Sequence, residues 1–191
     1  MGNIIELIFI VDCSKAMNGK EFETVSSINS IIDSYRRRDE IVYVNTFAFH
    51  KEARMLHDRL KIETVKPMTI SDFKAGGDAA LYDAVGIVIN HFRNIHHYIR
   101  TEDIPYKTIF HIYSSGLENA SVKYNRSDIR VLIEQQKKNC KWKFFFENEN
   151  IFTARNELIL AKEPQTEIES VINDSDFATL MKILGNSKLK W

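Results

Sequence analysis

The feature that most constrains the fold is an apolar run close to the start of the chain. Residues 4–11 are almost all apolar and rich in β-branched side chains, and the run ends on Asp12. An uninterrupted run of this kind is typical of a strand that is buried on both faces of a parallel sheet. The polar stretch of small residues behind it resembles the start of a ligand site at a strand's carboxyl end. The sequence therefore predicts a central strand with a loop of functional interest.

Strand-like and helix-like segments alternate along most of the chain. Apolar residues at helical spacing predict three helices, over 20–35, over a long segment after Gly77, and over 128–138. Apolar runs predict further strands, over 40–48, 108–113 and 142–146. Ser127 is the expected N-cap of the third helix, and 53–56 is expected to be a charged edge strand. The predicted fold is a three-layer α/β/α sandwich on a Rossmann-like, mainly parallel sheet with one antiparallel edge strand.

The carboxyl-terminal part of the chain continues this pattern less clearly. It predicts a helix over 151–162, a weak strand over 168–172 and an amphipathic helix over 176–184. We expect residues 1–164 to form the domain core and residues 165–191 to pack on the same domain. Docking of a partner on the last helix is the alternative.

Charge and composition exclude several classes of function. Lys plus Arg and Asp plus Glu balance at 26 each, so the basic excess typical of a nucleic-acid binder is missing. The first apolar run is too short for a signal peptide or a membrane span. Cys13 and Cys140 make no disulfide framework. These features predict a cytoplasmic protein with neither a nucleic-acid nor a membrane partner.

Three stretches together resemble the metal-site loops of the von Willebrand factor type A domain family. They are "VDCSKAM" after the first strand, "GGDAALYDAVG" at the start of the long helix, and "IYSSGLENAS" after a central strand. The resemblance covers about residues 4–164 and is closest to a bacterial intracellular branch of the family. It implies the fold predicted above and a role in protein–protein interaction. In the family these loops hold one divalent cation, usually magnesium. A carboxylate of the partner often completes the coordination shell of that cation.

The five ligand positions implied by the resemblance are only partly kept. Asp12 and Ser14 match the first aspartate and the first serine, whereas the second serine, the threonine and the second aspartate are replaced by Ala16, Ala79 and Ser115. Magnesium requires near-octahedral oxygen coordination, and a methyl group offers no oxygen. We therefore expect a degenerate adhesion site with no tightly bound metal and no other cofactor. A weak magnesium site at Asp12 and Ser14 is the alternative.

The expected function is a non-enzymatic interaction module whose partner binds the loops at the carboxyl ends of the strands. Asp78, next to the threonine position, is not expected to rescue the metal site, because its side chain leaves the loop in another direction. The residues expected to contact the partner are Ser14, Lys15, Asn18, Asp78, Ser114, Ser115, Glu118 and Asn119.

Signals for catalysis or for a second metal site are weak. Cys13 lacks a histidine in the matching loops that could act as its base, and Asp12 lacks the second acid that phosphoryl transfer needs. His91 and His96 are five residues apart, which does not place both on one helix face, so we expect a solvated helix end there. His111 is expected to be a buried histidine with a hydrogen-bonded partner.

Overall fold

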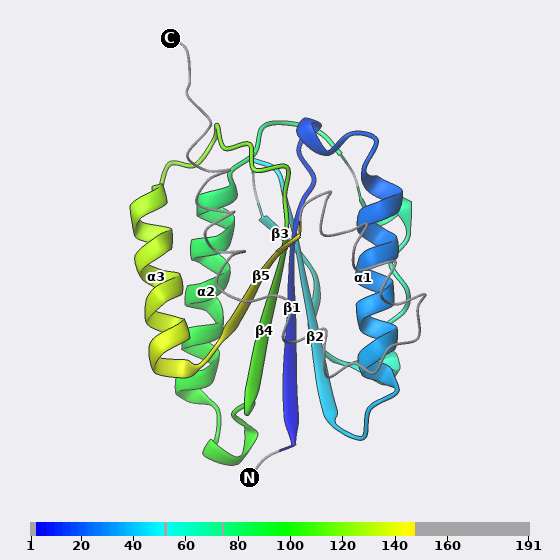
Figure 1. The fold of residues 1–191 in the computed structure, drawn as a ribbon, viewed down its shortest axis with the longest axis vertical. Coiled ribbons are helices and arrows are strands. Elements are labelled where there is room, and N and C mark those ends of the chain that lie inside the picture. Colours follow the sequence, from blue (N-terminus) through cyan, green and yellow to red (C-terminus); the bar gives the residue numbers. More distant parts are fainter. Residues whose placement is uncertain (1–2, 52, 74, 148–191) are drawn as a thin grey trace.

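The structure is a computed structural model, and it describes residues 3–147 with the exception of residues 52 and 74. A five-stranded sheet lies between helices on both faces (Figure 1). The strands are β1 (Ile4–Asp12), β2 (Ile41–Phe49), β3 (Ala53–Lys61), β4 (Lys107–Tyr113) and β5 (Lys143–Glu147). The helices are α1 (Glu21–Arg36), α2 (Leu81–Tyr98) and α3 (Arg126–Cys140).

The strand order in the sheet is β3-β2-β1-β4-β5. β1 pairs in parallel with both β2 and β4, and β4 pairs in parallel with β5. β3 pairs antiparallel with β2, so it is the antiparallel edge strand. This arrangement confirms the predicted fold class. The chain order reverses between β1 and β4, which is where ligands bind in sheets of this kind.

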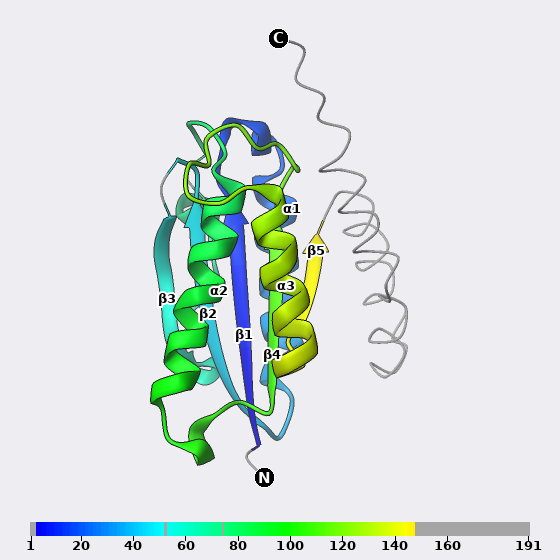
Figure 2. The same cartoon turned by 90° about the vertical axis from the view of Figure 1, so that its left-hand side faces the viewer.

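The two faces of the sheet are covered by different helices, α1 on one side and α2 with α3 on the other (Figures 1 and 2). Alternate residues of β1 divide between two cores. Leu7 and Phe9 belong to the core that includes α1, whereas Ile8 and Ile10 belong to the core of α2 and α3. The period of two along a strand explains this division. All nine residues of β1 are buried, as the apolar run predicted.

Glu6 is the one charged residue in the middle of β1, and its side chain is fully buried. Its carboxylate lies 2.6 Å from Nε2 of His96 at the end of α2 and 3.6 Å from Nε of Arg59 on β3. The expectation that His96 belongs to a solvated helix end is therefore wrong. A histidine at a helix position that looks exposed by spacing is instead the hydrogen-bond partner of a buried acid.

The predicted environment of His111 in β4 is confirmed. Its Nδ1 lies 2.9 Å from Oε1 of Glu147 in β5, and both side chains are buried. The rings of Phe9 and Phe145 stack on the imidazole, each at 5.3 Å between centroids. The neighbouring strands thus provide both the polar partner and the apolar walls of this histidine.

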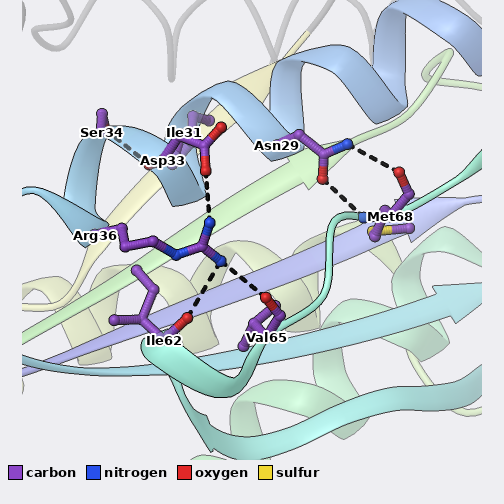
Figure 3. Close-up of polar contacts among 8 residues, drawn as sticks. All are labelled: Asn29, Ile31, Asp33, Ser34, Arg36, Ile62, Val65 and Met68. Atoms are coloured by element: carbon purple, nitrogen blue, oxygen red, sulfur yellow. Dashed lines mark hydrogen bonds and ion pairs between the residues drawn. The ribbon is translucent and has the colours of Figure 1, made fainter.

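Helix α1 is fastened to the segment after β3 by side chains that bond to backbone groups (Figure 3). Arg36 donates to the carbonyl oxygens of Ile62 and Val65 at 3.3 and 2.8 Å. The amide of Asn29 donates to the carbonyl of Met68 and accepts from its N–H, at 2.9 and 2.8 Å. These bonds satisfy the backbone of a segment that has few hydrogen bonds of its own.

Two predicted boundaries need correction. Ser127 is not the N-cap of α3, because the helix begins at Arg126 and the side chain of Asn125 accepts from the N–H groups of Ser127 and Asp128. The edge strand is longer than the predicted 53–56, since pairing with β2 extends it to Lys61.

The elements predicted beyond residue 147, and with them the proposed division at residue 164, lie outside the described residues. Within the described chain, no helix combines the length and apolarity needed to cross a membrane.

Candidate functional site

Three loops meet at the carboxyl end of the sheet, as the resemblance implied. We name them the first loop (13–20, after β1), the second loop (75–80, before α2) and the third loop (114–125, after β4). The first and second loops are joined by backbone hydrogen bonds, from Lys15 N–H to the carbonyl of Gly77 at 3.1 Å and from Gly76 N–H to that of Cys13 at 2.8 Å. Gly77 has a positive φ, which allows the turn that brings the two backbones together.

Asp12 lies at the centre of this meeting point and is fully buried. One carboxylate oxygen accepts from the N–H of Ser14 at 2.8 Å, and the other accepts from the hydroxyl of Ser114 at 3.0 Å. Burial raises the pKa of Asp12, and the hydrogen bonds from both serines oppose this rise only in part. Both oxygens of the carboxylate are therefore engaged inside the protein, linking the first loop to the third.

The other four positions implied by the resemblance contribute little oxygen at this place. Ser14 is only 1% exposed, and its hydroxyl has no hydrogen-bond partner among the described residues. Ala16 is half-buried and Ala79 is 0% exposed, and each presents a methyl group. The hydroxyl of Ser115 accepts from the N–H of Leu117 at 3.3 Å, within its own loop.

Glu118 of the third loop makes more hydrogen bonds than its sequence position suggested. Its two carboxylate oxygens accept from the N–H groups of Ala120 and Ser121, from the hydroxyl of Ser121, and from Tyr82 N–H at the start of α2. These distances lie between 2.7 and 3.0 Å. The carboxylate is occupied by the protein itself, on a half-buried residue.

Asp83 in the first turn of α2 has a matching role, which sequence reasoning missed. Its carboxylate accepts from the N–H groups of Val122, Lys123 and Tyr124 at 2.8 to 2.9 Å. Burial tends to raise the pKa of Asp83, but these three donors and the charge of Lys123 outweigh it and leave the pKa below its ordinary value. The signal was available, since an acid in the first turn of a helix is a common ligand for N–H groups.

The residues predicted to contact a partner differ in how much surface they offer. Lys15, Asn18, Asp78 and Asn119 are exposed, whereas Ser114, Ser115 and Glu118 are half-buried. Ser14 is buried, so in this conformation its side chain offers almost no surface to a partner. Asp78 lies 3.5 Å from the side-chain nitrogen of Asn119, on the outer rim of the loops.

Neither a reactive thiol nor a histidine–carboxylate metal cluster is found at the loops. Burial, reinforced by the nearby Asp12 charge, raises the pKa of Cys13 to about 12, so this thiol remains protonated at neutral pH. Within residues 3–147, apart from the two gaps, no group of three His, Cys, Asp or Glu side chains is arranged to hold a metal ion.

Comparison of whole structures finds similar proteins where comparison of sequences finds none. No protein-family profile and no curated protein sequence match the chain. A von Willebrand factor type A protein from Catenulispora acidiphila aligns with a TM-score of 0.50 at 15% identity, over 76% of this chain and 32% of that one. A manganese-loaded TRAP protein from Plasmodium vivax aligns with a TM-score of 0.53 at 16% identity, over 86% of this chain and 66% of that one.

The chain spans less than two thirds of either of these neighbours. At such low identities the likeness bears on the fold alone. Together with the sheet order and the single antiparallel edge, it shows that the chain has a Rossmann-like α/β fold of the von Willebrand factor type A kind.

Proposed function

We propose that this chain is a non-enzymatic protein-interaction module that binds its partner through the first, second and third loops without a tightly bound cation. The fold supports the general class, because von Willebrand factor type A domains are interaction modules. The observation that carries the finer proposal is the donor set around Asp12, because Ala16 and Ala79 present methyl groups at two positions where the family has hydroxyl groups.

The donor set supports the absence of a tight metal site. Magnesium needs nearly ideal octahedral oxygen coordination and tolerates distortion poorly. The methyl groups of Ala16 and Ala79 supply no oxygen, and the Ser115 hydroxyl is engaged by the Leu117 N–H. A cation at this place would therefore find one carboxylate, Asp12, whose oxygens already accept one hydrogen bond each, and no oxygen at Ala16 or Ala79. The residues present do not fit the ion.

Recognition at the loops would then depend on shape and ordinary hydrogen bonds. The exposed side chains available for it include Lys15, Asn18, Asp78 and Asn119, together with Leu117, which is 45% exposed. Acidity of the partner should matter less than in relatives that present a metal ion, because no divalent charge is offered to a carboxylate.

The proposal also includes a cytoplasmic setting in a bacterial cell and no nucleic-acid or membrane partner. The balanced charge of the whole chain supports the last point. Cys13 and Cys140 are both free, which is typical of a reducing compartment. The bacterial assignment depends on the sequence motifs alone.

Thermal unfolding in magnesium, in manganese and in EDTA tests the cation-free proposal. We expect the same midpoint in all three, because a protein without a metal site gains no stability from the ion. A site with a dissociation constant a hundredfold below the added metal would add about 2.7 kcal/mol. For a chain of this size that gain would raise the midpoint by roughly 5 to 10 °C. A rise of that size in either metal would contradict the proposal.

A weak, metal-dependent site at Asp12 and Ser14 is the second candidate, and one observation favours it. The buried hydroxyl of Ser14 lies near enough to the Asp12 carboxylate to lower its pKa but makes no hydrogen bond of good geometry, so a ligand or water would complete it. A manganese-dependent rise in the unfolding midpoint that Asp12→Ala removes would support this candidate. Asp39→Ala, on an exposed residue far from the loops in sequence, is the matched control.

A further inference from the structure

Helix α2 begins without a cap of its own. Its N-cap residue is Ala80, which has no side-chain acceptor for the first N–H groups of the helix. Those groups need acceptors, because the first turn has no intrahelical partners for them. The third loop provides them: Glu118 accepts from Tyr82 N–H at 2.9 Å, and the hydroxyl of Ser121 accepts from Asp83 N–H at 3.0 Å. The cap of α2 is therefore tertiary.

The same two segments are bonded in the opposite direction as well. Asp83 in the first turn of α2 accepts from three consecutive N–H groups of the third loop, those of residues 122–124. A carboxylate near a helix N-terminus is also favoured by the helix dipole, which applies to both Glu118 and Asp83. The "LYDAVG" and "GLENAS" stretches thus satisfy each other's backbone groups.

Ala79, at the threonine position of the resemblance, is held by its backbone alone. Its N–H donates to Oδ1 of Asn119 at 2.9 Å, and its carbonyl accepts from the N–H groups of Asn119 and Ala120, both at 3.1 Å. Its methyl group is completely buried. Three hydrogen bonds therefore join the second loop to the third at the residue where the family would place a metal ligand.

We propose that Glu118 and Asn119 are positioning residues that tie the second and third loops together and hold the binding face in one conformation before a partner arrives. The inference rests on the proposed function in one respect, that these loops are the binding face. What the chain keeps of the family's loop pattern serves this loop-to-helix capping, and what it lacks is the oxygen that a cation would need.

The sequence grouped Glu118 with the residues expected to contact a partner, and the inference gives it a different role from theirs. Glu118 contributes through α2 and its own loop, while the exposed rim residues Lys15, Asn18, Asp78 and Leu117 are left to contact the partner. A face ordered in advance avoids the entropic cost of ordering loops on binding.

Amide hydrogen exchange of the full chain in EDTA measures the positioning directly. In the wild type we expect the N–H groups of Ala79 and Tyr82 to be protected. Asn119→Ala removes the acceptor of Ala79 N–H, so exchange at Ala79 should accelerate by about tenfold or more, as expected when a buried donor loses its partner. Asn119→Asp keeps an acceptor oxygen and should restore the protection. Glu118→Ala removes both acceptor oxygens and should accelerate exchange at Tyr82 in the same way.

Asn18→Ala, an exposed first-loop change, is the matched control and should leave both amides unaffected. The amide of Ile8 in β1 reports global unfolding. If Asn119→Ala accelerates Ile8 as much as Ala79, or accelerates neither, the local positioning role is wrong. The role is also wrong if the wild-type amides are unprotected.

The same experiment repeated in magnesium separates the two proposals. Protection at Ala79 that rises with the metal in the wild type would contradict the cation-free function. Protection that does not respond to the metal but is lost in Asn119→Ala supports both proposals. If Asn119→Ala leaves the protection at Ala79 unchanged and magnesium also has no effect, the positioning role is wrong but the cation-free function is not contradicted.

Discussion

At the scale of single residues, the carboxylates around the loops are ligands for the protein's own N–H and O–H groups. Asp12 binds donors of the first and third loops, Glu118 caps α2, and Asp83 holds three N–H groups of the third loop. A loop acid read from sequence alone suggests a metal or partner ligand, but buried backbone donors compete for the same oxygens.

Asp83→Asn should lower the stability at neutral pH, because an amide oxygen cannot replace both carboxylate oxygens for three donors. We expect a loss of about 1 to 3 kcal/mol at pH 7. Since the folded-state pKa of Asp83 is lowered, the stabilisation is complete above the unfolded pKa of about 3.9 and is lost as the pH falls through the folded value.

Urea unfolding of wild type and variant at pH 7, 5 and 3 checks this prediction. The two stabilities should differ most at pH 7 and 5 and converge towards pH 3. Asp39→Asn, on an exposed side chain, should show no such convergence. A difference between Asp83→Asn and wild type that stays constant with pH would contradict the account.

At the scale of elements, α2 and α3 pack on the same face of the sheet, and Gly86 of α2 lies against the third loop. A Cβ added at Gly86 would lie 2.7 to 2.8 Å from ring atoms of Tyr124, closer than carbon atoms approach in proteins. The hydroxyl of Tyr124 also accepts from the side chain of Asn90 at 2.9 Å, so the ring cannot move away without cost. Close packing, rather than a turn, requires this glycine.

Gly86→Ala should therefore destabilise the protein even though alanine is the better helix former by about 1 kcal/mol. We expect a net loss of roughly 1 to 3 kcal/mol from overpacking. In a Tyr124→Ala background the clash is absent, and the same change should become neutral or stabilising. Urea unfolding of the four proteins measures this coupling. Equal effects of Gly86→Ala in both backgrounds would show that the ring is not the obstacle.

At the scale of the whole molecule, a buried charge connects parts that are distant in sequence. Glu6 in the central strand faces His96 from α2 and Arg59 from the edge strand. Removing one partner of a buried ion pair leaves the other without compensation, which is more costly than replacing both by apolar residues. This cluster therefore couples the central strand, one edge strand and one helix.

Glu6→Met should cost about 3 to 5 kcal/mol, because His96 loses its buried hydrogen-bond acceptor and Arg59 its ion-pair partner. The double variant Glu6→Met with His96→Leu should recover much of that loss, since the partly exposed Arg59 can turn to solvent. Chemical denaturation of the two single variants, the double variant and the wild type measures the recovery. Additive losses in the double variant would show that the two side chains are independent.

Much of the fold could be predicted because its signals are local. The short, β-branched apolar run over 4–11 favours a strand inside a sheet, and the helical spacing over 20–35 gives α1 within one residue at each end. The alternation of strands and helices along the chain then leaves few possible sheet topologies. The loops could also be recognised, because motifs in "VDCSKAM" and "GLENAS" follow strand ends in a fixed order.

What the sequence by itself determined, then, is the layered α/β architecture and the place where three loops would converge. Only the tertiary structure decided which groups those loops bind. Glu118 accepts from Tyr82 N–H across 36 positions of the chain, and His96 reaches Glu6 across 90. Hydrogen bonds depend on distances of about 3 Å between atoms. Residue type and spacing along one chain do not specify such distances until the sheet has brought the segments together.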